Sequence, residues 1–94
     1  MALTPEGKVK ARVRRELDAA NVYYFMPATG GYGRSGVPDI VGCCDGKFFA
    51  IECKAGNNTT TSLQDIELHK INKAGGIALV INETNIMDVN FIWT

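Results

Sequence analysis

Residues 36–56 read GVPDIVGCCDGKFFAIECKAG, and this stretch decides the fold of the chain. At its centre lies Asp45-Gly46, a dipeptide typical of the two-residue turn of a β-hairpin. On either side of the turn are runs rich in residues that favour strands, namely 40–44 and 47–53. The sequence therefore predicts an antiparallel hairpin. Three ionisable residues interrupt this apolar hairpin and need an explanation: Asp39, Glu52 and Lys54.

The turn fixes which residues of the two strands face each other. If it has two residues, Cys44 faces Lys47, and the same register places Asp39 opposite Glu52. Opposite side chains have Cβ atoms about 5 Å apart, and two like charges at that distance are destabilising. Lys54 projects from the same face as Glu52, because strand side chains alternate. A longer turn would shift the register and weaken this inference.

Two carboxylates at this separation are suitable ligands for Mg²⁺ or Mn²⁺. Such an ion beside a fixed ammonium group can polarise a phosphodiester, lower the pKa of a coordinated water and offset transition-state charge. The grouping of Asp39, Glu52 and Lys54 therefore indicates metal-assisted phosphodiester hydrolysis. The alternative is structural: Asp39 would be a turn residue after Pro38, and the other two an exposed polar stripe on an edge strand.

The rest of the chain predicts a single α/β domain over residues 1–94. Thr4-Pro5-Glu6 is typical of a helix start, and Gly75-Gly76 of a helix end. The expected architecture is a mixed sheet flanked by helices, in the order α-β-β-β-α-β-β. Besides the hairpin, the expected elements are a helix over 5–20, a strand over 22–26, a helix over 63–74, a buried and possibly parallel strand over 77–81, and a final short strand over 91–93.

Composition shows neither the basic excess of many DNA-binding domains nor the segments of a secreted or membrane protein. The formal net charge is zero, so the chain lacks the basic excess of many nucleic-acid-binding domains. Residues 1–34 nevertheless hold six basic and three acidic side chains, which would suit a polyanion bound on one side, although such a run is also typical of a solvated helix face. No signal peptide or apolar membrane span is present, so we expect a cytoplasmic protein without membrane contact.

The three cysteines lack the paired spacing of a zinc site and lie in apolar strand sequence, so we expect small buried hydrophobes. They are Cys43, Cys44 and Cys53. In the first helix, a turn of 100° per residue places Glu6 on the apolar face, pointing inward. The basic residues Lys8, Arg12 and Arg15 point outward on the same wheel.

Gln64 has two interpretations. Thr61-x-x-Gln64 fits a capping box, in which the glutamine side chain bonds to the Thr61 amide. The helical wheel also places Gln64 on the inward stripe with Leu68 and Ile71, where its amide needs a polar partner from the site.

Other polar and aromatic residues carry weaker signals. Tyr32, Arg34 and Ser35 lie in a glycine-rich loop just before the motif, where they can contact phosphate or simply belong to a connection. His69 has no partner at ligand spacing and is expected on the surface of its helix. Trp93 is expected either in the core or at a dimer contact.

These motifs resemble a known nuclease signature. Gly36-x-Pro38-Asp39, a hairpin and then Glu52-x-Lys54 resemble the PD-(D/E)xK pattern. Over nearly the whole length, the chain is similar to the stand-alone virus-type replication-repair nuclease (VRR-NUC) family, which is typical of phages and bacteria. The similarity includes an acid in the first helix, "GVPDIVG", "FFAIECKAG", and a glutamine-bearing helix that runs into "AGG" and an apolar strand.

The resemblance implies a restriction-endonuclease-like fold and a DNA endonuclease that depends on Mg²⁺ or Mn²⁺. Its small members act as homodimers on branched DNA, including four-way (Holliday) junctions. By this analogy, Asp39, Glu52 and the backbone carbonyl of Cys53 bind metal, and Lys54 positions or activates the attacking water. Glu6 would hold a water or the substrate side of the site. A phage-encoded member would act in the cytoplasm of its bacterial host, in DNA repair or replication.

Two rival functions stay open at this point. The first is a nuclease for flaps, ends or ordinary duplex DNA. The second is a DNA-binding or assembly subunit that has the fold but does not cleave. The intact Asp39, Glu52 and Lys54 argue against the second rival.

Overall fold

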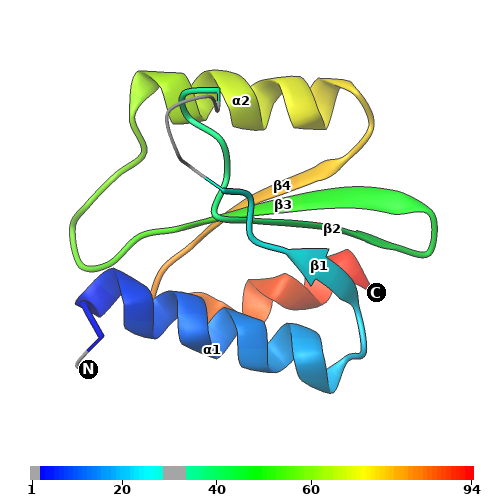
Figure 1. Cartoon of the computed structure of the whole chain (residues 1–94), viewed down its shortest axis with the longest axis horizontal. Helices are drawn as coiled ribbons and strands as arrows, with labels where there is room; N and C mark the ends of the chain where they lie inside the picture. Colours follow the sequence, from blue (N-terminus) through cyan, green and yellow to red (C-terminus); the bar gives the residue numbers. More distant parts are fainter. Residues whose placement is uncertain (1–2, 29–33) are drawn as a thin grey trace.

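A computed structural model describes residues 3–28 and 34–94 of the chain. Figure 1 shows a four-stranded sheet between two helical layers. One face is covered by α2 (Ser62–Lys73), and the other by α1 (Pro5–Ala19) together with the 3₁₀ helix η1 (Ile86–Ile92). The expected mixed α/β architecture is confirmed.

The sheet has the strand order β1-β2-β3-β4, so each strand pairs with its neighbour in the sequence. The strands are β1 (Tyr23–Phe25), β2 (Ile40–Cys44), β3 (Lys47–Cys53) and β4 (Ile77–Ile81). The β1-β2 and β2-β3 pairs are antiparallel, whereas β3 and β4 are parallel and connected through α2. The predicted bounds of the two hairpin strands and of the strand over 77–81 are confirmed. The parallel pairing expected for the strand over 77–81 is also confirmed.

The hairpin turn has the two residues that the sequence predicts. Asp45 and Gly46 have φ values of 51° and 80°, the positive values that a type I′ turn requires. Cys44 pairs with Lys47 and Ile40 with Ile51. Continued by one step, this register places Asp39, which directly precedes β2, opposite Glu52.

The core lies between the sheet and the α1/η1 layer. Val9, Val13 and Leu17 recur along one side of α1 and pack against the β3 side chains Phe49 and Ile51, all of them at most 2% exposed. The expected helix 5–20 thus begins where the proline and the Thr4 cap place it and ends one residue early.

The predicted final strand over 91–93 is wrong, because η1 occupies this part of the chain. Ile86, Val89 and Ile92 recur every three residues, which places them on one side of a 3₁₀ helix that repeats every three residues. All three are buried against the core, and Trp93 is half-buried beside them. The apolar residues therefore cover a sheet face instead of extending the sheet.

Two expectations about burial are also wrong. Cys43 is exposed, since it lies on the sheet face toward α2 at the β1-β2 side, which α2 does not cover. Cys44 is half-buried, and only Cys53 is in the core, with no exposed surface. The strand over 77–81 is not fully buried either, because β4 is an edge strand and Val80 on it is 42% exposed.

Candidate active site

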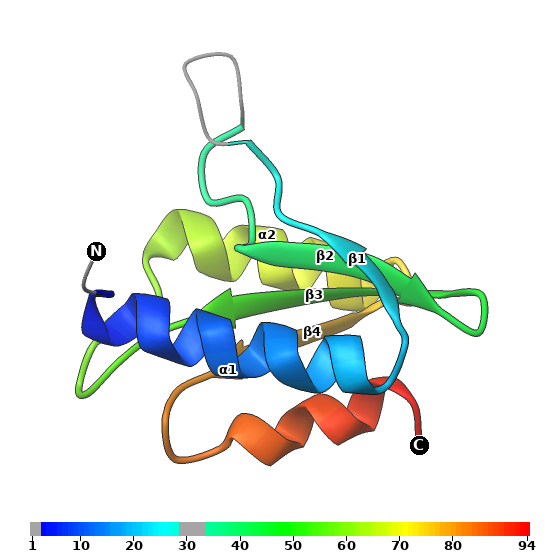
Figure 2. The same cartoon turned by 60° about the horizontal axis from the view of Figure 1, so that its bottom comes forward.

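The predicted acidic residues lie at the open end of the hairpin, between the starts of α1 and α2. In Figure 2, the first turns of α1 and α2 and the tip of β3 lie at the same end of the sheet. A helix N-terminus carries a partial positive charge, which favours anionic groups nearby. Glu6 in the first turn of α1 and Gln64 in the first turn of α2 both lie at this end.

Gly36 brings the start of α2 close to the segment that leads into Asp39. Its φ is 77°, a value that side-chain-bearing residues rarely adopt. A Cβ atom at this position would lie 2.5 Å from the backbone of Leu63 in α2. The first glycine of the motif is therefore required by close packing of two backbones, and this packing sets α2 over the acidic pair.

Asp39 is anchored by both of its oxygens. The backbone N–H of Cys53 donates to Asp39 Oδ2 at 2.8 Å, which ties the carboxylate to the end of β3. Lys10 Nζ of α1 lies 3.6 Å from Asp39 Oδ1. Lys10 is not part of the sequence motif, although it follows Glu6 by four residues and so lies on the same side of the helix.

Glu52 is a buried carboxyl group, with 2% of the residue exposed. Gln64 Nε2 donates to its Oε1 at 3.1 Å, whereas Oε2 is buried and has no hydrogen-bond partner among residues 3–28 and 34–94. Buried polar atoms are normally paired, so this oxygen is completed either by a proton shared with Asp39 or by a bound cation. A divalent cation between Oε2 and Asp39 would supply that partner, and the oxygen-only donor set suits Mg²⁺ or Mn²⁺.

The electrostatics of Glu52 fit the same interpretation. Burial and the negative charge of Asp39 raise the pKa of Glu52 to about 8, and the Lys54 ammonium acts in the opposite direction. Glu6 contributes a smaller upward shift of this pKa, so it lies within electrostatic range. Without a cation, the acidic pair therefore keeps a proton near neutral pH.

Gln64 satisfies both of its interpretations at once. Its Oε1 accepts from the Thr61 N–H at 2.9 Å and completes the capping box, while its Nε2 donates to Glu52. One side chain thereby fixes the start of α2 and the orientation of an acidic residue.

Cys53 faces the core, as the alternation of β3 predicts. Burial raises the pKa of its thiol to about 12, so the sulfur stays protonated and is not a thiolate ligand. In the part of the chain that the structure describes, no three His, Cys, Asp or Glu side chains gather as a metal site. A bound ion would therefore rely on two carboxylates, with a backbone carbonyl and waters as further ligands.

The predicted DNA-contact residues have different outcomes. Tyr32 lies outside the described residues. Arg34 forms an ion pair with Glu67 of α2, with Nη2 and Oε1 2.8 Å apart, and Ser35 is exposed. His69 is exposed on α2, and Lys8, Arg12 and Arg15 are exposed on α1, as predicted.

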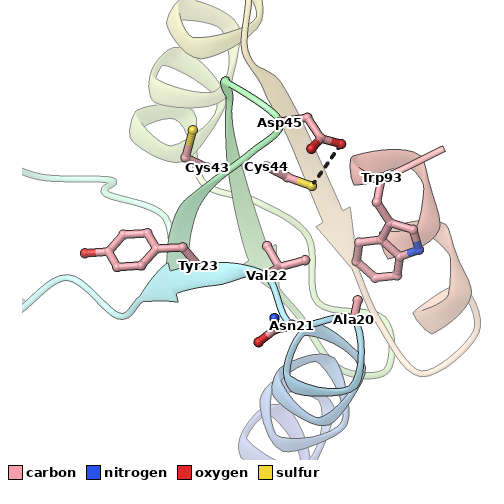
Figure 3. A pocket seen from close by; sticks show the side chains of 8 residues that line it. All are labelled: Ala20, Asn21, Val22, Tyr23, Cys43, Cys44, Asp45 and Trp93. Atoms are coloured by element: carbon pink, nitrogen blue, oxygen red, sulfur yellow. Dashed lines mark hydrogen bonds between the residues drawn. The ribbon is translucent and has the colours of Figure 1, made fainter.

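A separate pocket of about 570 Å³ lies at the turn end of the hairpin (Figure 3). Cys44 points into it toward Trp93, while Cys43 and Tyr23 point away. Asp45 is the one acidic residue among the described residues that line it. This pocket therefore lacks the paired carboxylates of the opposite end.

Comparison with known families agrees with the geometry. Residues 21–91 match the sequence profile of the archaeal Holliday junction resolvase family, Hjc. The chain belongs to this family. The matched part contains the hairpin, Asp39, Glu52, Lys54 and Gln64, but not α1 with Glu6 and Lys10.

A comparison of structures gives the same fold class. A solved structure described as a "VRR_NUC domain" superposes with a TM-score of 0.75 at 20% sequence identity. The match covers 97% of this chain and 99% of the other. No curated protein sequence matches the chain. The restriction-endonuclease-like fold expected from the sequence is therefore confirmed, together with the PD-(D/E)xK relationship.

Proposed function

We propose that this resolvase-family protein is a divalent-metal-dependent endonuclease that cuts four-way DNA junctions as a homodimer. The observation that carries the proposal is Glu52 Oε2, a buried oxygen that has no hydrogen-bond partner in the described part of the chain. It lies beside Asp39, between the starts of α1 and α2. A cation at this position would satisfy the oxygen and offset the charge of both carboxylates.

Each residue of the acidic end has a proposed role. Asp39, Glu52 and the carbonyl of Cys53 hold Mg²⁺ or Mn²⁺, which when bound lowers the pKa of a water and offsets charge on the phosphate. Lys54 positions the attacking water and stabilises the charge that develops on the phosphoryl oxygens. Glu6 orients a water on the substrate side, and Gln64 orients Glu52 through their hydrogen bond.

A row of exposed apolar residues supports the homodimer. Tyr23 lies opposite Cys43 and Cys43 opposite Phe48, so the three side chains form a line across β1, β2 and β3. Phe25 lies beside this line on the same face, two residues from Tyr23. We call these four residues the apolar row. Tyr23 is 69%, Phe25 52% and Phe48 46% exposed.

The area of the apolar row fits the centre of an interface with a second copy. A fully buried aromatic side chain covers about 150–250 Å², so the exposed fractions leave on the order of 300 Å² of aromatic surface. A stable interface needs about 800 Å² per partner, with an aromatic centre and a polar rim. Glu67 and Lys70 of α2 line a pocket with Phe48, and Leu63 lies one turn before Glu67 with 53% exposure.

In a two-fold dimer, this side of α2 in each copy would pack on the apolar row of the other copy. Each copy has one acidic site, and two copies would allow two nicks in one junction. Light scattering tests this arrangement: we expect a dimer for the natural chain and monomers for Tyr23→Glu and Phe48→Glu. Met87→Glu is the control, since Met87 is 57% exposed on η1 at the opposite face. If only Met87→Glu dissociates the dimer, the interface lies on the η1 face, and the proposed arrangement is overturned.

Cleavage assays test the activity itself. Purified protein is incubated with a four-way junction, a flap and a linear duplex, in Mg²⁺, in Mn²⁺ and with chelator. We expect junction cleavage that requires the ion and is lost in Asp39→Asn. Asp45→Asn is the matched control, because it changes the same functional group in the hairpin turn, where asparagine tolerates the positive φ.

The other outcomes separate the rival functions. Preferred cutting of flaps or linear duplex would overturn the junction assignment but keep the nuclease. Junction binding without cutting in any metal would favour a non-catalytic binding subunit. Equal activity of Asp39→Asn and Asp45→Asn would reject the proposed site.

A further inference from the structure

Lys10 is a basic residue in contact with the acidic site, and neither the PD-(D/E)xK motif nor the family match includes it. It lies on α1 one turn after Glu6, and its side chain is 33% exposed. Its neighbour Lys8 is exposed on the same helix. Lys10 is therefore the lysine of this pair that turns toward the sheet.

The two oxygens of Asp39 are in different surroundings. Oδ2 accepts the backbone N–H of Cys53 at 2.8 Å, a bond between atoms that the strand end holds in place. Oδ1 faces Lys10 Nζ at 3.6 Å. Because Oδ2 is engaged by the backbone, Oδ1 is the more available oxygen for a cation. The Lys10 ammonium thus lies beside the Asp39 oxygen that the Cys53 amide leaves open.

An ammonium group and a divalent cation repel each other at such a distance. Asp39 is held by its backbone bond, whereas lysine has a flexible four-carbon stem. The ion pair is also partly open to solvent, with 33% of the Lys10 side chain and 20% of the Asp39 side chain exposed. Salt and water screen a partly exposed pair, so Lys10 can leave without the cost of breaking a fully buried ion pair.

We propose that Lys10 is a positioning residue that holds Asp39 in the metal-free protein and is displaced by the metal ion. This exchange sets the metal affinity of the site. It also frees an ammonium group at the site edge, where it contacts a phosphate of the DNA backbone. The inference rests on the proposed metal-dependent function, and it adds a residue and a partner group to it.

Metal affinity in the absence of DNA is the first test. Mn²⁺ is titrated calorimetrically into the natural chain, Lys10→Met and Lys8→Met. Lys8→Met removes the same charge from the same helix, but Lys8 is exposed and turned away from the sheet. We expect Lys10→Met to bind Mn²⁺ about two- to fivefold more tightly, as a partly exposed ion pair would allow, and Lys8→Met to stay within the error of the natural chain.

Lys10→Arg provides a variant with the opposite expected sign. Guanidinium can form a bidentate pair with a carboxylate, so it should hold Asp39 more firmly and weaken Mn²⁺ binding. A merely structural ion pair predicts altered stability in these variants without a change in metal affinity. Circular dichroism checks that each variant is folded. If Lys10→Met is unfolded, the Mn²⁺ affinity of Lys10→Arg tests the role of Lys10 in its place.

The salt dependence of DNA binding is the second test. In a Lys54→Met background, which keeps both carboxylates, junction binding is measured over a range of salt with and without Mn²⁺. With Mn²⁺, we expect Lys10→Met to reduce the salt slope by about one, the loss of one phosphate contact. Without Mn²⁺, we expect no change, because Lys10 is then engaged by Asp39.

The outcomes keep this inference apart from the proposed function. If the natural chain binds no divalent ion, the proposed metal-dependent function fails. If it binds Mn²⁺ but Lys10→Met and Lys8→Met have equal affinities, only the role of Lys10 is overturned. A lower affinity in Lys10→Met would also overturn it, since Lys10 would then assist the ion.

Discussion

The two faces of β3 differ in what completes them. On the α1 side, Phe49, Ile51 and Cys53 have no exposed surface and are covered by the chain itself. On the α2 side, Phe48 is 46% exposed, and Glu52 has a buried oxygen without a hydrogen-bond partner in the part of the chain that the structure describes. The α1 face forms the hydrophobic core that stabilises the fold. The α2 face leaves aromatic surface and a carboxyl oxygen that a second chain and a ligand would cover. The predictions below test this division.

The largest expected effect is the difference between two adjacent phenylalanines. Phe49→Ala should lower the free energy of unfolding by about 3–5 kcal/mol, because it leaves a cavity in the core. Phe48→Ala should lower it by less than about 1 kcal/mol, because the ring is half-exposed. Urea unfolding measures both, at protein concentrations low enough for the monomer to dominate, because Phe48 lies in the proposed dimer interface. Similar losses in the two variants would mean that the two faces are equally closed.

The next effect concerns Glu52. Glu52→Gln keeps the shape of the side chain and can still accept from Gln64, but it removes the charge needed to hold a cation. We expect junction cleavage to fall on the order of 10³-fold, the scale of losing transition-state charge stabilisation. Without metal, stability at pH 7 should rise, because folding of the natural chain at this pH requires the Glu52 carboxyl to take up a proton, whereas glutamine is neutral in both states. Full activity in this variant would remove Glu52 from the site.

A smaller effect separates the two roles of Gln64. Gln64→Glu keeps the capping box, because glutamate also serves at this position, but it removes the donor to Glu52. Cleavage should fall about 10- to 100-fold, as is typical when a supporting residue of a metal site is lost. Thr61→Ala is the counterpart: it should lower stability by about 1 kcal/mol and leave cleavage nearly unchanged. Equal effects on cleavage would mean that Gln64 acts only through the helix.

A last effect is the dependence of stability on pH without metal. The pKa of Glu52 is about 8 in the folded protein and near 4.5 when unfolded, so the folded state binds the extra proton between these values. Stability should therefore fall as pH rises from about 5 to 8, by at most about 1.4 kcal/mol per pH unit. Thermal unfolding across this range measures the slope. Glu52→Gln or added Mg²⁺ should flatten it, and a slope that persists in Glu52→Gln would assign it to other groups.

Much of the fold followed from local patterns in the sequence. Asp45-Gly46 fixed the hairpin register, and the register placed Asp39 opposite Glu52 before any tertiary contact was considered. The helix caps at Thr4 and Thr61 are likewise local signals. The final 3₁₀ helix was not predicted, because a short apolar run at the chain end is compatible with a strand and with a helix that covers the sheet.

The site could be predicted only in part. Its acidic pair lies within one hairpin, so the motif was sufficient to bring the two residues together. Lys10 was not found, because its contact with Asp39 depends on how α1 crosses the sheet, although its spacing from Glu6 gave a hint. The exposure of Cys43 depends on how much of the sheet α2 covers, and alternation along a strand does not contain that information.

Proton release on metal binding tests the central claim most directly. Calorimetric titration of Mn²⁺ at pH 7, in buffers of different ionisation enthalpy, gives the number of protons released for each ion bound. Because the pKa of Glu52 is about 8 in the metal-free protein, we expect close to one proton per ion in the natural chain, and neither proton release nor tight binding in Glu52→Gln. Binding without proton release, or equal affinity in Glu52→Gln, would contradict the assignment of this buried carboxyl group as the metal ligand.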